Sequence, residues 1–403
     1  MLNVFYLYSV MWAIILLLYS LGWSDLCMPL SGDTIVFVLL MIGCSALFGF
    51  IFKKKFKFRK LNKNPHKKPI ITILLFIFYI LDLLYEQYVP IFNVFRGNSM
   101  YEKAFYGIPM FHFLVSGFTF IYCFYLAYLF ACFKKGSLII EYLVSISLFV
   151  FLFQRQNIMI VVLGTVLILL SSIKIRNLSA LKKLLCLTVI VVFSFILLYI
   201  FGIMGNVRYG IWDSNDSSMI IAVGKINDQF PNFIPKPYAW AYIYAVSPLA
   251  NLQHNINIGI DKSATVYDFI WQFLPNFFSK RLPYQSVIQS ELIVPSLTVS
   301  TAYSDVFRSS GFFGMLSVYF AQTAIVAIVV QLYHRNGKYR VSAYLSVIYF
   351  YLLSFFSNPM IYDITSLIVI YLLLYYIIDN FLLTFLYLPI CKRQLSAKGR
   401  NAK

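Results

Sequence analysis

The sequence predicts an all-α polytopic membrane protein with about ten transmembrane helices. Of its 403 residues, 61% are hydrophobic and only 12% are charged, and the mean hydropathy is +0.78. Soluble domains carry about twice that charged fraction. Several stretches of about 20 residues, the length that the hydrocarbon core of a bilayer requires, hold almost no charge. The composition therefore favours a chain that crosses a membrane many times.

The predicted spans follow one another along most of the chain. The first has no basic n-region and no small-residue cleavage site, so we interpret it as a retained span and not as a signal peptide. The spans are expected at about 2–21, 34–52, 70–90, 108–131, 137–153, 157–173, 184–203, 311–332, 341–357 and 364–388.

Alternate connections between these spans are strongly basic and lack Asp and Glu. They hold most of the 33 Lys and Arg residues and lie at 53–68, 134–135, 174–183, 334–340 and 391–403. Because cytoplasmic connections carry the positive charge, we expect both termini in the cytoplasm. The net charge of +18 then reflects topology and contact with anionic lipid headgroups, and we expect no nucleic-acid partner.

One long polar segment, 204–310, divides the chain. Seven spans precede it in 1–203, three follow in 311–390, and a basic cytoplasmic tail occupies 391–403. By the same topology the segment lies outside. Connections this long are usually functional when they lack regular structure, so we expect a lid over a site that opens outward; an inert cap over the helices is the alternative.

Two stretches of this segment predict short helices at the membrane surface. Residues 237–252 are apolar but too short to span, and Pro248 interrupts them. We expect a re-entrant or interfacial helix that is broken at this proline, with Trp240 at headgroup depth. Residues 265–282 form a second amphipathic stretch.

The sequence predicts neither metal nor cofactor. Its six cysteines are scattered, mostly within apolar runs, without metal-ligand spacing or a disulfide framework, and are expected to be small buried hydrophobes. Asp213 and Asp216 resemble metal ligands only weakly, because two carboxylates in one loop do not make a site.

Five stretches stand in an order that carries a family resemblance. They are RQNIMIVVLG, FGIMGNVRYG, YAVSPLANL, WQFLPNFFSKRL and VPSLTVSTAYSDVFRSSGFFG. In this order they resemble the O-antigen polymerases, the Wzy-type oligosaccharide repeat-unit polymerases of bacteria. The resemblance is detailed over residues 150–320. In the rest of the chain only the pattern of hydropathy is similar. Where many relatives carry Asp-Phe-Gly, this chain has Asp305-Val-Phe-Arg-Ser-Ser-Gly.

The resemblance implies a glycosyltransferase of the bacterial inner membrane with a GT-C-like polymerase and ligase architecture. Such enzymes transfer a growing glycan from undecaprenyl pyrophosphate to the terminal sugar of a new lipid-linked repeat unit, without a nucleotide sugar. The product is O-antigen or a related surface polysaccharide of the lipopolysaccharide type. The implied partners are undecaprenyl-pyrophosphate-linked oligosaccharides, membrane lipids and a chain-length regulator protein.

That chemistry gives the arginines on the outer side a role. The leaving pyrophosphate gains charge in the transition state, and arginine forks onto phosphate oxygens. The candidates are Arg155, Arg208, Arg281 and Arg308, and the alternative for each is an interfacial anchor. Arg155 also begins the sixth span, where a helix N-terminus attracts anions. We expect Arg155, Arg208 and Arg281 to converge on one cavity.

The acceptor hydroxyl benefits from a general base. His254, Glu291 and Asp305 are the catalytic candidates in the long segment, although Asp305 could instead be the N-cap of the eighth span. Asp82 and Glu86 lie four residues apart within the third span. Because carboxylates in a membrane need a partner, we expect them to pair with an outer arginine, with a catalytic or proton-relay role as the alternative.

Two other functions fit the same pattern of spans. An O-antigen ligase would use the same donor with a different acceptor, and the order of motifs favours the polymerase. A flippase or ion-coupled transporter would be expected to show repeats, broken helices at the midplane and short outer loops. Here the polar residues are concentrated in one long segment, which favours the enzyme.

Overall fold

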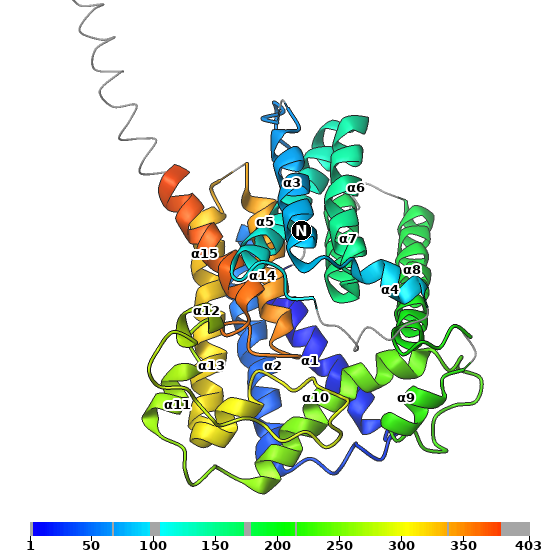
Figure 1. Cartoon of the computed structure of the whole chain (residues 1–403), viewed down its shortest axis with the longest axis vertical. Coiled ribbons are helices and arrows are strands. Elements are labelled where there is room, and N and C mark those ends of the chain that lie inside the picture. The colour runs from blue at the N-terminus through cyan, green and yellow to red at the C-terminus, as the bar shows by residue number, and fades with distance from the viewer. Residues whose placement is uncertain are drawn as a thin grey trace, which may run out of the picture.

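The structure is a computed structural model that describes residues 3–66, 68–96, 105–172, 179–213, 216–336 and 338–379 (Figure 1). Helices make up 68% of it. Among the described residues, strand character is confined to one isolated bridge between Ser24 and Ile226. The prediction of an all-α membrane protein is confirmed at the level of fold class.

The long apolar helices coincide with the predicted spans. Within the described residues, three of them, α2, α5 and α13, are long and apolar enough to cross a membrane, and several others are apolar but shorter. The number of spans and their orientation remain predictions. The helices are α1 (Val4–Ser20), α2 (Gly32–Phe52), α3 (Ile70–Glu86), α5 (Phe111–Phe133), α6 (Gly136–Phe151), α7 (Arg155–Ser172), α8 (Ala180–Arg208), α13 (Ser304–Tyr333), α14 (Arg340–Leu353) and α15 (Asp363–Ile377).

Helix α5 is the centre of the bundle. It packs against α6, α7, α14 and α15, and side chains around most of its circumference are buried. The ring of Phe120 stacks on Tyr349 of α14 at 4.8 Å and lies 5.1 Å from Phe149 of α6. A helix that is apolar on all sides belongs inside a bundle, and this explains the position of α5.

Other helices keep apolar faces on the surface. Large side chains such as Leu39 of α2, Leu84 of α3 and Leu184 of α8 are exposed together with many apolar neighbours. Water-soluble monomers rarely expose contiguous apolar patches of more than a few hundred Å². These faces fit contact with lipid, which is why the structure supports membrane association.

Residues 204–303, the part of the long segment that precedes α13, fold into one long helix, α10 (Tyr238–Ile258), and three short ones, α9 (Ser218–Val223), α11 (Val266–Trp271) and α12 (Asn276–Ser279). In Figure 1 they lie along the lower and left edges of the molecule. Helix α10 packs against α1, α8 and α13, and α11 packs against α13. The segment is therefore an ordered part of the bundle.

The predicted break at Pro248 is wrong. Helix α10 continues through this proline to Ile258. A proline inside a helix removes one backbone hydrogen bond. Here Val246 and Leu249 on either side of it are fully buried, and this packing holds the helix together across the proline.

A glycine kink separates the long segment from the eighth apolar run. Gly311 lies within α13 with φ 64° and ψ −154°, a conformation that glycine adopts without strain. The kink coincides with the predicted start of a span at 311. Residues 304–310 consequently form a short helix that precedes the longer apolar one.

Some predictions fall at the edge of the structure or beyond it. The basic tail at 391–403 and the end of the tenth predicted span lie outside the described residues. Asp379, the last described residue, accepts a hydrogen bond of 3.3 Å from the side-chain amide of Asn336.

Candidate functional site

The end of α8 packs closely on the beginning of α10. A Cβ atom at Gly202 would lie 2.2 Å from a backbone oxygen at the start of α10, and one at Gly205 would lie 2.7 Å from the ring of Trp240. The indole N–H of Trp240 donates a hydrogen bond of 2.6 Å to the side-chain oxygen of Asn206. This contact explains the glycines of the FGIMGN stretch and holds the backbone two residues before Arg208.

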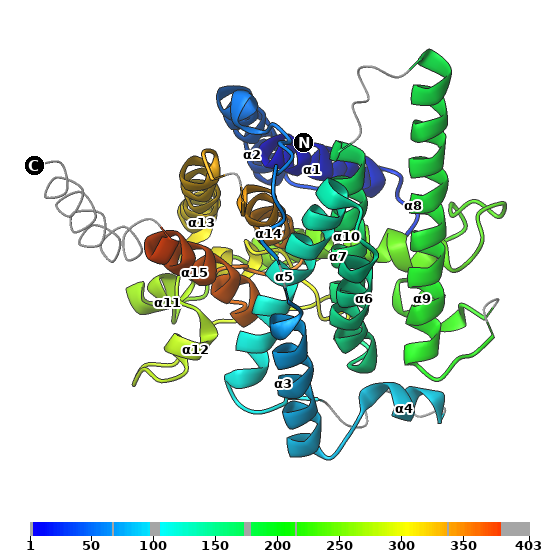
Figure 2. The ribbon, with the colours of Figure 1, turned by 90° about the horizontal axis from the view of Figure 1, so that it is seen from above.

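Arg155 and Arg208 stand at the same end of two neighbouring helices. Arg155 begins α7, Arg208 ends α8, and these antiparallel helices pack together. The short helix α4 (Pro90–Phe95) lies between this end of α6–α7 and α8 in both ribbon views (Figures 1 and 2). The predicted phosphate contacts of the two arginines fall outside the described side chains.

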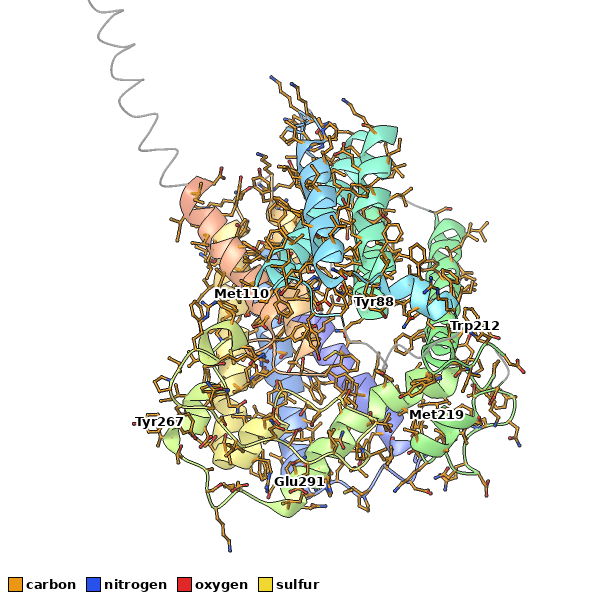
Figure 3. All side chains as sticks on the ribbon, in the orientation of Figure 1. Tyr88, Met110, Trp212, Met219, Tyr267 and Glu291 are labelled. Carbon is orange, nitrogen blue, oxygen red and sulfur yellow. The ribbon has the colours of Figure 1, made fainter. Side chains whose placement is uncertain are left out.

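Helix α4 bridges this end of the bundle. Figure 3 shows Tyr88 beside one end of it and Trp212 beside the other. The rings of Phe95 and Trp212 stack with their centroids 6.5 Å apart. The chain that follows α8 is thus in contact with the connection that follows α3.

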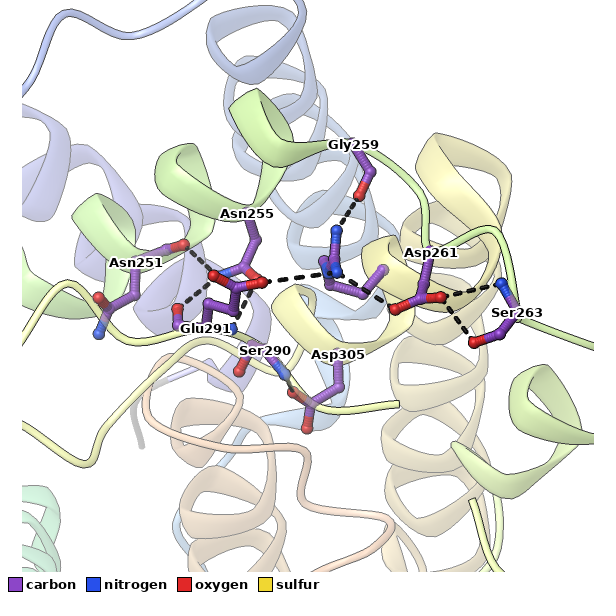
Figure 4. Close-up of polar contacts among 9 residues, drawn as sticks. Asn251, Asn255, Gly259, Asp261, Ser263, Ser290, Glu291 and Asp305 are labelled. Atoms are coloured by element: carbon purple, nitrogen blue, oxygen red, sulfur yellow. Dashed lines mark hydrogen bonds and ion pairs between the residues drawn. The ribbon is translucent and has the colours of Figure 1, made fainter. Parts of the chain in front are cut away.

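Two asparagines of α10 hold the chain that precedes α13 (Figure 4). The side chain of Asn255 accepts a hydrogen bond from the N–H of Glu291 and donates one to its carbonyl oxygen, both at 2.8 Å. One turn earlier, Asn251 accepts from the N–H of Ile293 at 3.0 Å and donates to the carbonyl oxygen of Val299 at 2.8 Å. We call this pair of asparagines the clamp, because it satisfies backbone groups that would otherwise need water or a strand partner.

Arg308 is buried at the centre of this region. Its guanidinium donates to the carbonyl oxygen of Gly259 at 2.5 Å and to the carboxylate of Asp261 at 3.3 Å, and it lies 3.7 Å from the carboxylate of Glu291. Hydrogen bonds from Ser263, assisted by the charge of Arg308, lower the pKa of Asp261. Two carboxylates already face this arginine, so its contacts are those of a residue that holds the loop in place.

Asp305 does not cap α13. The N-cap position is occupied by Tyr303, and the carboxylate of Asp305 accepts a hydrogen bond of 2.7 Å from the N–H of Ser290. It therefore fastens the same loop that the clamp holds. The N-cap alternative is wrong because α13 begins at Ser304, two residues before the start that an N-cap at Asp305 would require.

Asp82 is paired with a histidine, and Glu86 accepts hydrogen bonds from backbone amides. Asp82 contacts the ring nitrogen Nδ1 of His112 at 2.5 Å and accepts a hydrogen bond of 2.7 Å from the N–H of Ile108. Glu86 accepts one of 2.9 Å from the N–H of Gly107. For Asp82 the expected pairing with an outer arginine is wrong, because His112 and the N–H of Ile108 occupy its carboxylate.

The polar contacts of His112 continue into the turn between α6 and α7. Its other ring nitrogen, Nε2, lies 3.5 Å from the side-chain nitrogen of Gln154. The side-chain oxygen of Gln154 accepts a hydrogen bond of 2.7 Å from Asn157. The carboxylate of Asp82 is thereby linked to the residue that directly precedes Arg155.

The structure brings only some of the predicted residues together. Glu291, Asp305 and Arg308 surround one loop, and half-buried His254 lies on α10 beside the clamp. Arg281 is exposed just after α12, whereas Arg208 ends α8 on the opposite side of the molecule in both ribbon views. The expected convergence of Arg155, Arg208 and Arg281 is therefore not found.

Two separate polar centres result. Figure 3 shows Glu291, of the Arg308 centre, well apart from Met110, which precedes α5 and His112. Sequence reasoning missed the second centre. The available signal was that Asp82 lies near the end of one span and His112 near the start of the next, so that a tight connection could bring them together.

No group of three or more His, Cys, Asp or Glu side chains that could hold a metal ion occurs in the described part of the chain. Comparison with family models, curated proteins and solved structures finds no match to this chain. Its function is consequently argued from its own residues and from the order of its motifs.

Proposed function

We propose that the chain is a membrane glycosyltransferase that polymerises oligosaccharide repeat units carried on undecaprenyl pyrophosphate. The observation that carries this proposal is the contact between the end of α8 and α10, made by Gly205, Asn206 and Trp240. It joins the stretch FGIMGNVR to the 204–303 segment and holds the backbone close to Arg208. The first is one of the motifs on which the resemblance to O-antigen polymerases rests, and Trp240 lies on α10, the helix that carries a second one, YAVSPLANL.

The arrangement of helix ends suits a lipid pyrophosphate. Arg155 lies at the N-terminus of α7, where unpaired backbone N–H groups and the helix dipole favour an anion. Arg208 stands at the same end of the neighbouring helix. In this proposal the two arginines stabilise the charge that grows on the leaving pyrophosphate more than they stabilise the ground state.

The surfaces of the molecule agree with a lipid-linked substrate. The apolar faces of α3 and α8 are exposed, and the short helix α4 and the polar 204–303 segment lie beside them. A substrate of this class keeps its polyprenyl chain in the bilayer and its glycan in water. In this assignment the protein resides in the bacterial inner membrane and acts on its outer face.

An O-antigen ligase remains the second candidate, because it would use the same donor. The distinction lies in the acceptor, which is a lipid-linked repeat unit for a polymerase and a lipid core oligosaccharide for a ligase. A flippase is less well supported, since the polar residues of the sequence are concentrated in one long segment.

Deletion of the gene in its host tests the assignment. Gel analysis of surface glycan should show single capped repeat units in place of a ladder, and plasmid-borne wild-type protein should restore the ladder. Complete loss of capped lipid would instead identify a ligase or a flippase. An unchanged ladder would contradict all three functions.

A further inference from the structure

A buried carboxylate–histidine pair joins α3 to α5. Oδ2 of Asp82 lies 2.5 Å from Nδ1 of His112, and the two residues are 1% and 4% exposed. A carboxylate accepts hydrogen bonds only, so Nδ1 carries the proton of the neutral ring. The other nitrogen, Nε2, is then left with a lone pair and can accept a proton.

The carboxylate is held so that it cannot turn away. Its second oxygen, Oδ1, accepts the N–H of Ile108, and a Cβ atom at Gly107 would lie 2.6 Å from that oxygen. Gly107 has φ 67°, and its own N–H donates to Glu86. Because the loop closes tightly over Asp82, the carboxylate fixes both the tautomer and the direction of the His112 ring.

The free nitrogen of His112 faces the turn that leads to Arg155. Its neighbour there is the side-chain nitrogen of Gln154 at 3.5 Å, the outer limit of a hydrogen bond. Gln154 is half-buried and is turned by its contact with Asn157 so that its N–H₂ points to the ring. To reach Nε2, a substrate hydroxyl must take the place of this contact, because His112 is only 4% exposed.

We propose that His112 is the general base that accepts the proton of the attacking sugar hydroxyl, and that Asp82 is its positioning residue. This inference rests on the proposed glycosyl transfer and names the residues that would activate the acceptor. The base is then not one of the candidates in the 204–303 segment but a residue at the start of α5. This is the end of the bundle at which α7 begins with Arg155.

The step balances without a further reactant. The acceptor hydroxyl gives its proton to Nε2 of His112, and its oxygen forms a bond to the anomeric carbon of the donor glycan. The bond from that carbon to the pyrophosphate oxygen breaks, and its electron pair leaves with the lipid pyrophosphate. The imidazolium, stabilised beside Asp82, then releases the proton to water.

The earlier candidates fit this role less well. Glu291 faces Arg308 at 3.7 Å, and its backbone is fastened by Asn255. His254 has no carboxylate partner among the described residues that would orient its ring. A histidine that is oriented by a buried carboxylate is a recurring arrangement of general bases in enzymes.

The test uses purified full-length protein in lipid vesicles with the undecaprenyl-pyrophosphate-linked repeat unit of its host. His112→Gln keeps an N–H that can donate to Asp82 but has no basic nitrogen. We expect it to lower the rate of chain extension by about 100-fold to 10,000-fold. The matched control, His254→Gln, should stay within about twofold of wild type.

A second variant separates chemistry from folding. His112→Ala should be inactive, and added imidazole should restore part of its activity, because the small base can enter the space left by the ring. Asp82→Asn should lower kcat with little change in KM, and Asp82→Glu should recover part of the loss. A purely structural role would not show rescue by imidazole.

The outcomes separate this inference from the function beneath it. If wild-type protein extends the glycan and His112→Gln does so at a similar rate, the base assignment is overturned and the polymerase stands. If wild-type protein itself extends nothing in vesicles that hold intact substrate, the proposed function fails and the base assignment fails with it.

Discussion

Trp240 donates its indole N–H to the side chain of Asn206 at 2.6 Å, and this bond ties the first turn of α10 to the last turn of α8. Both residues are buried. A hydrogen bond between two buried side chains is costly to break, because each partner is then left unsatisfied. The position of the 204–303 segment relative to the apolar helices therefore depends on this pair.

The first prediction concerns the fit of these two helices. In Gly205→Ala the new Cβ would lie 2.7 Å from the Trp240 ring, so α10 must shift. We expect a loss of about 1–3 kcal/mol in the free energy of unfolding, seen as a lower melting temperature in detergent. The matched control is Gly43→Ala in α2, where no atom lies within 4 Å. Equal melting temperatures for both variants would contradict the packing described.

The second prediction concerns the clamp. Asn255→Ala removes both hydrogen bonds to the backbone of Glu291, and we expect a cost of about 1–3 kcal/mol for the groups left without partners. Because the loss is local, limited proteolysis should cut near residue 291 at least several times faster than in wild type. Asn232→Ala, at an exposed position away from the clamp, serves as the control. Cleavage that is equally slow in both variants would exclude the clamp as the holding contact.

The third prediction is a pH dependence. Burial alone would raise the pKa of Asp268, but hydrogen bonds from Ser286, Tyr284 and Thr265 outweigh it and lower the pKa to about 2. A carboxyl whose pKa is lower when folded stabilises the fold above its unfolded pKa, near 4, and loses that contribution as the pH falls toward 2. The melting temperature of the wild-type protein should therefore fall more steeply, as the pH is lowered from about 4 to 2, than that of Asp268→Asn. Parallel curves would contradict it.

The fourth prediction concerns topology. The basic connections predict that reporter fusions at Lys60, Lys182 and Lys338 report the cytoplasm and that a fusion at Asn227 reports the outer side. The measurement compares a reporter active only outside with one active only inside at each position. A cytoplasmic result at Asn227 would remove the 204–303 segment from the face where lipid-linked glycans are joined.

Much of the bundle was predictable, because apolar runs and charge-free length are read directly from the sequence. The kink at Gly311 coincides with the predicted start of a span, because the apolar run of the sequence begins there. The course of α10 was not predictable from Pro248, since the buried neighbours that hold the helix across the proline come from distant parts of the chain.

The site was harder to predict than the fold. The predicted outer segments contain arginines and carboxylates in comparable numbers. Which of them pair depends on which loops lie next to each other in the folded chain. The tight turn at Gly107 brings His112 to Asp82. The sequence near either residue contains no pattern that predicts this contact. Arg308 was expected to bind phosphate, yet Asp261 and Glu291 face it, because the chain on both sides of α11 folds back onto α13.

The most direct test of the central assignment is the length of glycan made by purified protein in vesicles that contain its lipid-linked repeat unit. Wild-type protein should convert single units into a ladder on a gel. Arg155→Lys and Arg208→Lys should each lose most of this activity while still inserting normally, because lysine keeps the charge but lacks the bidentate fork that holds a pyrophosphate. A ladder of normal length from both lysine variants would remove these arginines from the donor site. Single units alone from the wild-type protein would contradict the assignment as a polymerase.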